Sequence, residues 1–182
     1  MRIRPSAPLW AALIALATFS LFVVAPGGDA RAADPPPNSQ RKGSGLPLPR
    51  FASLRSDEVN VRTGPGTRYP VDWVFKRKGM PVEIVAEYEN WRKIRDWQGA
   101  SGWVHQSLLT GKRSFIIAAK PASLHKTPAT AAEVVAKLEP EVMGEIRSCS
   151  GDWCRVRVAN GGVSGWLERT AFWGVYKSEP IN

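Results

Sequence analysis

From Phe51 onward, hydrophobic and polar residues alternate in short runs separated by Gly, Pro, Asn and Asp. Alternation with a period of two is typical of half-buried β-strands. The pattern predicts strands over residues 59–62, 71–75, 81–88, 91–95 and 102–105, followed by a short helical turn over 106–109. In the third strand Val82, Ile84 and Ala86 share one face, which we expect to point into the core, and Glu83 lies on the opposite face.

The same order of elements recurs in the second half of the chain. Trp153 follows Trp91 by 62 positions, and Trp166 follows Trp103 by 63. A fixed offset over several elements indicates an internal duplication. The sequence therefore predicts an all-β chain of two tandem repeats, over residues 51–111 and 112–176. Units of this size bury little surface, so we expect large aromatic anchors and an extra constraint.

The N-terminal region has the pattern of a secretory signal peptide. Arg2 and Arg4 precede an apolar run over residues 9–25 and an Ala-x-Ala cleavage site at Ala30–Ala32, which predicts a signal peptide over residues 1–32. An uncleaved membrane anchor is the alternative, because the run approaches the roughly 20 residues of a spanning helix. Residues 33–50 are rich in Pro, Gly and polar residues and predict a flexible linker. We expect an exported protein, periplasmic or extracellular, without a further span.

The chain is basic, with 25 Lys and Arg against 16 Asp and Glu. Such a balance favours an anionic partner, and export argues against nucleic acid. The excess is spread evenly, at +2 over residues 51–111 and +3 over 112–173, so no segment forms a basic arm. An ordinary solvated surface and a weak attraction to anionic cell-wall polymer or lipid head groups both remain open; dependence on salt would distinguish them.

Two local motifs stand out. Asn60–Gly66 reads Asn-Val-Arg-Thr-Gly-Pro-Gly, and Gly-Trp pairs occur at Gly102-Trp103 and Gly165-Trp166. Together these motifs resemble the bacterial SH3-like family over residues 51–173. The resemblance implies two tandem small β-barrels, of the kind that attach exported proteins to cell walls or to other proteins.

The first motif also has a physical interpretation. Val61 is expected to point inward and Asn60 and Arg62 outward, while Gly64 and Gly66 permit unusual backbone angles around the stiff Pro65. The matching stretch of the second repeat, residues 123–130, keeps the aliphatic residue and the proline but loses the Asn, the Arg and both glycines. We therefore expect any binding through this motif to belong to repeat 1.

The tryptophans divide into two groups. Trp103 and Trp166 each follow a glycine in a strand, and we expect their indoles to fill the barrels. Trp91 and Trp153 occupy equivalent places, which favours a role in the fold.

Other aromatic residues occur only in repeat 1. Trp73 and Trp97 have no aromatic counterpart in repeat 2, and Tyr69 lies in the loop after the glycines. With Asn60 and Arg62 they are the candidate binding residues, expected to be partly exposed and suited to saccharide faces or peptides. Packing of one repeat on the other is the alternative.

Cys149 and Cys154 lie on either side of a predicted hairpin turn, and in an exported protein such a pair predicts a disulfide. A metal site is not expected, because His105 and His125 belong to different repeats and no further ligands accompany the cysteines. A redox-active pair is not expected either, because the spacing is not Cys-x-x-Cys.

The sequence carries no nucleophile elbow, zinc-protease motif or phosphate loop. We therefore expect a non-catalytic module without a cofactor. Its ligand is expected to be peptidoglycan, bound through repeat 1. The alternatives are scaffolding of another envelope protein, or a purely architectural role.

Overall fold

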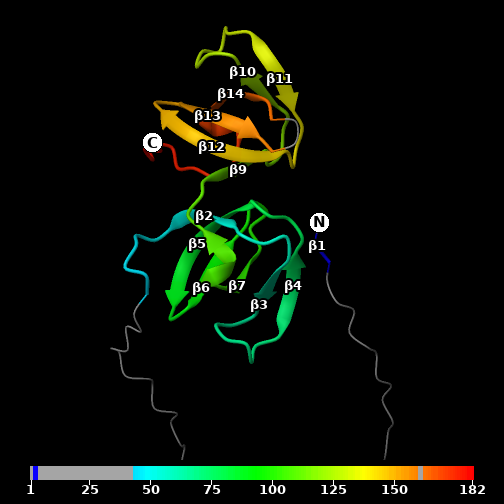
Figure 1. Cartoon of the computed structure of the whole chain (residues 1–182), viewed down its shortest axis with the longest axis vertical. Helices are drawn as coiled ribbons and strands as arrows, with labels where there is room; N and C mark the ends of the chain where they lie inside the picture. Colours follow the sequence, from blue (N-terminus) through cyan, green and yellow to red (C-terminus); the bar gives the residue numbers. More distant parts are fainter. Residues whose placement is uncertain (1, 4–42, 160–161) are drawn as a thin grey trace, which may run out of the picture. The chain divides into compact units, whose positions relative to one another are not determined.

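The computed structural model describes residues 2–3, 43–159 and 162–182 (Figure 1). The predicted signal peptide, apart from Arg2 and Ile3, and most of the predicted linker therefore lie outside the described residues. Among the residues that are described, no helix has the length and apolar character needed to cross a membrane. The described part contains no α-helix and consists of two β-sheets with short 3₁₀ turns.

The strands of repeat 1 belong to the first sheet. It confirms the five predicted strands to within a residue and adds two, over residues 50–54 and 109–110, that the sequence does not predict. Its strands are β2 (Arg50–Leu54), β3 (Val59–Arg62), β4 (Val71–Phe75), β5 (Pro81–Tyr88), β6 (Trp91–Arg95), β7 (Ser101–His105) and β8 (Leu109–Thr110). The order is β1-β4-β3-β7-β6-β5-β2-β8, where β1 (Arg2–Ile3) pairs antiparallel with β4. A 3₁₀ turn over Gln106–Leu108 follows β7, where the sequence predicts a helical turn.

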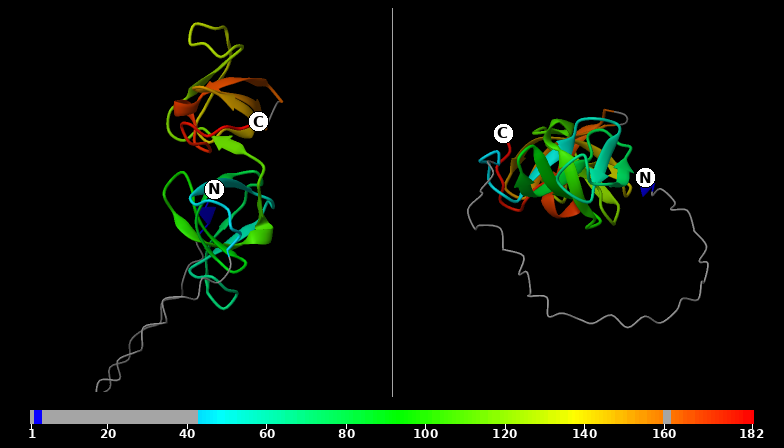
Figure 2. Two further views of the ribbon diagram at one scale, coloured as in Figure 1. Left: turned by 90° about the vertical axis from the view of Figure 1, so that its left-hand side faces the viewer. Right: turned by 90° about the horizontal axis from the view of Figure 1, so that it is seen from below.

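The second sheet is formed by repeat 2. Its strands are β9 (Ser114–Ile116), β10 (Ala122–His125), β11 (Val134–Leu138), β12 (Met143–Ser150), β13 (Trp153–Val158) and β14 (Ser164–Glu168), in the order β11-β10-β14-β13-β12-β9. A 3₁₀ turn over Arg169–Ala171 follows β14. Figure 2 shows from two further directions that the sheet of each repeat is strongly curved.

Strand registers confirm the duplication. Val61 pairs with Trp73 in repeat 1, and Leu124 pairs with Ala136 at the same place in repeat 2. Likewise, β3 meets β7 at Arg62 and Trp103, and β10 meets β14 at His125 and Trp166. The two repeats therefore share a pairing pattern as well as an order of strands.

The core of repeat 1 includes side chains from repeat 2. Ile116 of β9 and Met143 of β12 belong to the same buried cluster as Val61 and Val82. Phe51 of β2 also packs its ring against Trp173 at a centroid distance of 4.8 Å. Repeat 1 therefore does not complete its core alone.

The prediction for β5 is correct only in its first half. Val82 and Ile84 are buried, but a register shift between Ile84 and Ala86 interrupts the alternation, and Ala86 is only half-buried. Glu83, on the face opposite Val82, is buried as well because Arg95 pairs with it and the Tyr176 hydroxyl donates to it at 2.7 Å. Burial and this hydrogen bond raise the pKa of Tyr176.

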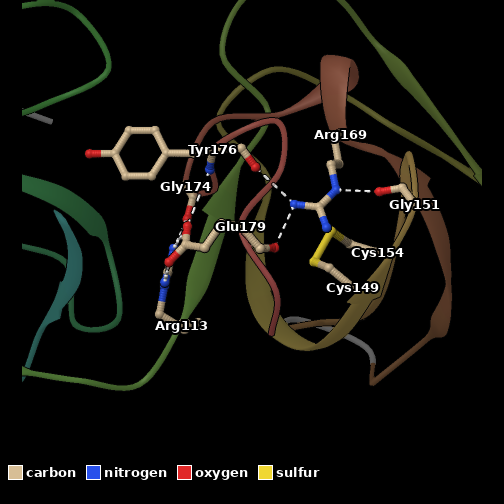
Figure 3. The surroundings of a disulfide bond; sticks show 8 residues. All are labelled: Arg113, Cys149, Gly151, Cys154, Arg169, Gly174, Tyr176 and Glu179. Carbon is tan, nitrogen blue, oxygen red and sulfur yellow. Dashed lines mark hydrogen bonds and ion pairs between the residues drawn. A yellow bond between two sulfur atoms is a disulfide. The ribbon is translucent and has the colours of Figure 1, made fainter. Parts of the chain in front are cut away.

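The predicted disulfide is confirmed. Cys149 and Cys154 form a directly opposed pair on β12 and β13, with sulfurs 1.99 Å apart (Figure 3). The backbone N–H of Cys149 also donates to the carbonyl of Ile181 at 2.8 Å, so the C-terminal segment lies along the bridged hairpin.

Two arginines hold the C-terminal segment in place (Figure 3). The buried guanidinium of Arg169 donates to the carbonyl oxygens of Gly151, Tyr176 and Glu179 at 2.7, 2.8 and 3.0 Å. Arg113 forms an ion pair with the Glu179 carboxylate. Burial opposes ionisation of Glu179, but the hydrogen bond and charge of Arg113 outweigh it and lower the pKa of this carboxyl.

The last residues of the predicted linker bind to repeat 1. The backbone N–H of Ser44 and the guanidinium of Arg50 each donate to the Glu87 carboxylate at 2.5 Å, and Arg92 approaches the same carboxylate at 3.1 Å. Burial of Glu87 opposes its ionisation, but the hydrogen bonds from Ser44 and Arg50 outweigh burial and lower its pKa to about 2. This carboxylate fixes a segment whose composition alone predicts flexibility.

Candidate functional site

The Gly-Trp pairs place their tryptophans outside the core. A Cβ on Gly102 would lie 2.4 Å from Cγ1 of Val61, and one on Gly165 would lie 2.6 Å from Cγ of Leu124, so both glycines face inward. Because side chains alternate along a strand, Trp103 and Trp166 point the other way, and both are half-buried. The prediction that these indoles fill the barrels is wrong.

Trp103 is part of a group of aromatic and basic side chains on adjacent strands. We define the repeat-1 outer face as Arg62, Trp91, Lys93, Trp103 and His105, all half-buried. Trp103 is paired with Arg62 on one side and Lys93 on the other, and Trp91 is paired with His105. Cross-strand partners have Cβ atoms about 5 Å apart, so the side chains of each pair are neighbours. The rings of Trp91 and His105 meet edge to face at 5.5 Å.

Repeat 2 has a related but different face. His125 replaces Arg62 at the register position opposite Trp166, and its ring meets Trp153 edge to face at 5.4 Å. Trp91 and Trp153 are both half-buried, as are Trp103 and Trp166, so no tryptophan of these two pairs belongs to a buried core. A role of Trp91 and Trp153 in the fold stays a prediction.

The loop of the first motif is held by Arg62 and occupied by Tyr69. The Arg62 guanidinium donates to the carbonyl oxygens of Tyr69 at 2.7 Å and Thr67 at 3.2 Å. The Tyr69 ring lies over the glycines: a Cβ on Gly64 would be 2.5 Å from it, and one on Gly66 would be 3.4 Å away. Arg62 therefore joins the loop to the repeat-1 outer face.

Of the two loop glycines, Gly64 leaves room for the Tyr69 ring, whereas a methyl group on Gly66 would make only an ordinary contact with it. Neither Gly64 nor Gly66 has a positive φ, so the predicted need for unusual backbone angles is wrong. The Tyr69 N–H bonds to the Gly66 carbonyl, and the loop of repeat 2 makes the same bond from Ala132 to Ala129. Repeat 2 keeps this turn without the glycines, and it also lacks the ring for which Gly64 leaves room.

The remaining candidates lie in different places. Trp73 is paired with Val61 and points to the same side of the sheet, toward the core, so only 7% of its surface is exposed. The expectation that Trp73 is exposed is wrong. Trp97 is half-buried and packs against the core of repeat 1. Asn60 is exposed on β3. Of the five candidates, the structure brings Arg62 and Tyr69 into contact.

Sequence reasoning missed Trp91, Trp103, Lys93 and His105 as surface residues. A signal was present in the alternation of β7: Val104 is an aliphatic residue of a half-buried strand, so its neighbour Trp103 has to face outward.

The described residues contain no group of three His, Cys, Asp or Glu side chains arranged to hold a metal ion.

The fit of the Tyr69 ring gives a first testable expectation. Gly64→Ala should lower the free energy of unfolding by about 1–3 kcal/mol, because the added methyl group overlaps the ring. Gly66→Ala is the matched control and should change stability by less than about 0.5 kcal/mol. Urea unfolding of both variants measures the difference.

A double-mutant cycle tests the cause. In a Tyr69→Ala background, which reproduces the alanine of repeat 2, Gly64→Ala should lose most of its cost. An equal cost in both backgrounds would mean that the backbone, and not the ring, requires the glycine.

Comparison with known proteins agrees with this architecture. The family model described as bacterial SH3 domain matches the chain twice, over residues 55–111 and 118–174. The chain therefore belongs to the bacterial SH3 domain family and carries two tandem copies of the domain.

One curated relative is the putative N-acetylmuramoyl-L-alanine amidase YrvJ of Bacillus subtilis (strain 168). It is 26% identical over 127 residues, which represent 64% of this chain and 24% of the amidase. The chain thus spans about a quarter of that relative's length.

Two solved structures from Trichomonas vaginalis were also matched, each at 14% identity. NlpC2 has a TM-score of 0.33, covering 72% of this chain and 50% of that one. NlpC1 has a TM-score of 0.31, covering 73% and 48%. At these values they add nothing to the fold described above.

Proposed function

We propose that this chain is an exported, non-catalytic module that binds peptidoglycan through the repeat-1 outer face and the adjoining Tyr69 loop. The observation that carries the proposal is the set of three aromatic rings and two cations on neighbouring strands, all accessible in part. Trp rings offer rigid apolar faces to sugar rings. Arg62 and Lys93 offer charge-assisted hydrogen bonds to carboxylates of stem peptides.

Membership of the bacterial SH3 domain family supports the proposal. The similarity to a protein named as a putative N-acetylmuramoyl-L-alanine amidase also supports it. The matched part is only 24% of that protein, which is compatible with a binding module and not a whole enzyme. Binding modules commonly accompany a separate catalytic part, and the present chain matches only that fraction of the amidase.

The test is retention of the purified protein on insoluble peptidoglycan. Tyr69→Ala/Trp103→Ala should abolish retention, since the first change removes the loop ring and the second removes the central indole of the outer face. The matched control is Trp166→Ala, which removes the equivalent indole from repeat 2 and should leave retention unchanged. Thermal unfolding of each variant establishes that it is folded.

Two results would contradict the proposal. Wild-type protein that stays in the supernatant would move the function away from the wall. Equal loss of retention in the repeat-1 and repeat-2 variants would show that the site is not confined to repeat 1.

The edge of repeat 2 favours a second candidate function, the binding of another envelope protein. β11 is the edge strand of its sheet, and its Val134 and Val135 are 45% and 43% exposed. An unpaired apolar edge is suited to the addition of a strand from a partner.

Crosslinking in the envelope, compared between wild type and Val135→Asp, distinguishes this candidate. The change introduces the residue type found at the equivalent Asp72 of repeat 1.

A further inference from the structure

A cavity of about 750 Å³ is formed by residues of both repeats. Its wall comes from β2 and the segment between β8 and β9 on one side, and from β12 and β13 on the other. Six of the residues that line it are basic: Arg55, Lys78, Lys112, Arg113, Arg147 and Arg157. Among the described residues that line it, Glu145 is the one acidic residue.

This cavity accounts for nearly the whole positive excess of the folded part. Residues 43–182 contain 20 Lys and Arg and 14 Asp and Glu, an excess of six. The cavity lining contains six basic residues and one acidic residue, an excess of five. The rest of that range is almost neutral. The basic lining residues come from several separate segments of the chain, so the sequence shows no basic segment.

Two of the six cations are neutralised by neighbours. Arg113 is paired with Glu179, and Arg147 with Glu145 at 2.8 Å. Arg55 donates its Nε–H to the carbonyl oxygen of Leu109 at 3.2 Å, which leaves its charge uncompensated.

Four cations remain without an anionic partner. In the part of the chain that the structure describes, no carboxylate lies within ion-pair distance of Arg55, Lys78, Lys112 or Arg157. All four residues are exposed. Like charges gathered around one hollow repel one another and create a strongly positive local potential. An anion with several charges would relieve that repulsion.

We propose that this cavity is a binding site for a multivalent oxyanion, separate from the repeat-1 outer face. The volume lies within the range of roughly 300–1,000 Å³ that is typical of small-ligand sites. Arginine and lysine bind phosphate and carboxylate oxygens through charge-assisted hydrogen bonds. The two unpaired arginines, Arg55 and Arg157, can each form two parallel hydrogen bonds to such a group. The ligand is a free anion or an anionic group of a larger molecule that carries phosphates or carboxylates.

Calorimetric titration of the purified protein tests the site with two probes. Tripolyphosphate represents phosphate ligands, and citrate represents carboxylate ligands. Lys78→Gln/Arg157→Gln removes one unpaired cation from each side of the cavity. The control, Lys120→Gln/Lys137→Gln, removes the same charge from exposed residues that do not line it.

The proposal is supported if either probe binds the wild type and the cavity substitutions weaken its affinity about tenfold or more, which corresponds to about 1.4 kcal/mol. The control substitutions should weaken the affinity about twofold or less. The probe that binds more tightly shows whether the site prefers phosphate or carboxylate oxygens. Absence of binding by both probes at low salt would overturn it. Equal weakening in both variants would also overturn it, because the attraction would then come from the whole surface.

Peptidoglycan retention gives an independent readout. The cavity variant should still be retained on peptidoglycan if the outer face is the wall-binding site. Failure of one proposal is therefore distinguishable from failure of the other.

Discussion

Replacing Arg169 by alanine is expected to lower the free energy of unfolding by about 4–5 kcal/mol. The guanidinium is buried and donates to three backbone carbonyls, of Gly151, Tyr176 and Glu179. Hydrogen bonds from charged groups contribute about 1.5–3 kcal/mol each, and their loss leaves buried acceptors unsatisfied. Urea unfolding measures the total change. Hydrogen exchange should show that the segment after residue 173 becomes less protected.

Arg155→Ala is the matched control for this change. Arg155 lies on β13 of the same repeat, and its side chain is exposed, so its removal should change stability by less than about 0.5 kcal/mol. If Arg169→Ala cost less than about 1 kcal/mol, the C-terminal segment would be held by other contacts, such as the bond from Cys149 to Ile181.

Acidification is expected to remove up to about 3 kcal/mol of stability through Glu87, whose side chain is only 6% exposed. Its pKa in the folded protein falls from 4.5 to about 2, and a tenfold change in an acid dissociation constant corresponds to about 1.4 kcal/mol. Because the folded pKa is the lower one, the contribution is fully present above pH 4.5 and is lost as the pH falls from there to about 2. Glu87→Gln should destabilise the protein at pH 7 and flatten the pH dependence of its stability within this window.

Glu133→Gln provides the comparison. Glu133 also pairs with a cation, Lys126, but its side chain is 68% exposed, and surface pairs of this kind contribute little. The control should keep the wild-type pH profile. A Glu87→Gln profile that runs parallel to the wild type between pH 4.5 and 2 would show that other carboxylates cause the acid sensitivity.

The fold was largely predictable because its signals are local. Alternation located the strands of repeat 1, and a near-constant offset between tryptophans revealed the duplication. The disulfide was predictable because Cys149 and Cys154 lie on either side of a single tight turn. The burial of Glu83 was not predictable, since it depends on Tyr176, which is 93 positions away.

The candidate site was predicted less well. Which face of a strand a tryptophan occupies depends on the phase of the alternation. The size and apolar character of Trp103 predict a core position, but Gly102 occupies that position. The lack of an aromatic counterpart to Trp73 in repeat 2 predicts either surface use or packing of one repeat on the other, but Trp73 packs inside repeat 1. A difference between repeats therefore does not separate surface residues from core residues.

The sharing of a core between the repeats has a consequence for how such chains evolve. Because Ile116 and Met143 of one repeat complete the hydrophobic cluster of the other, a recombination event that transferred residues 51–111 alone would leave that cluster exposed. The tandem pair is then the smallest unit that can be inherited intact. The outer faces of the two copies differ, with Arg62 in one and His125 in the other, whereas a change in the buried contacts between the copies would affect both copies.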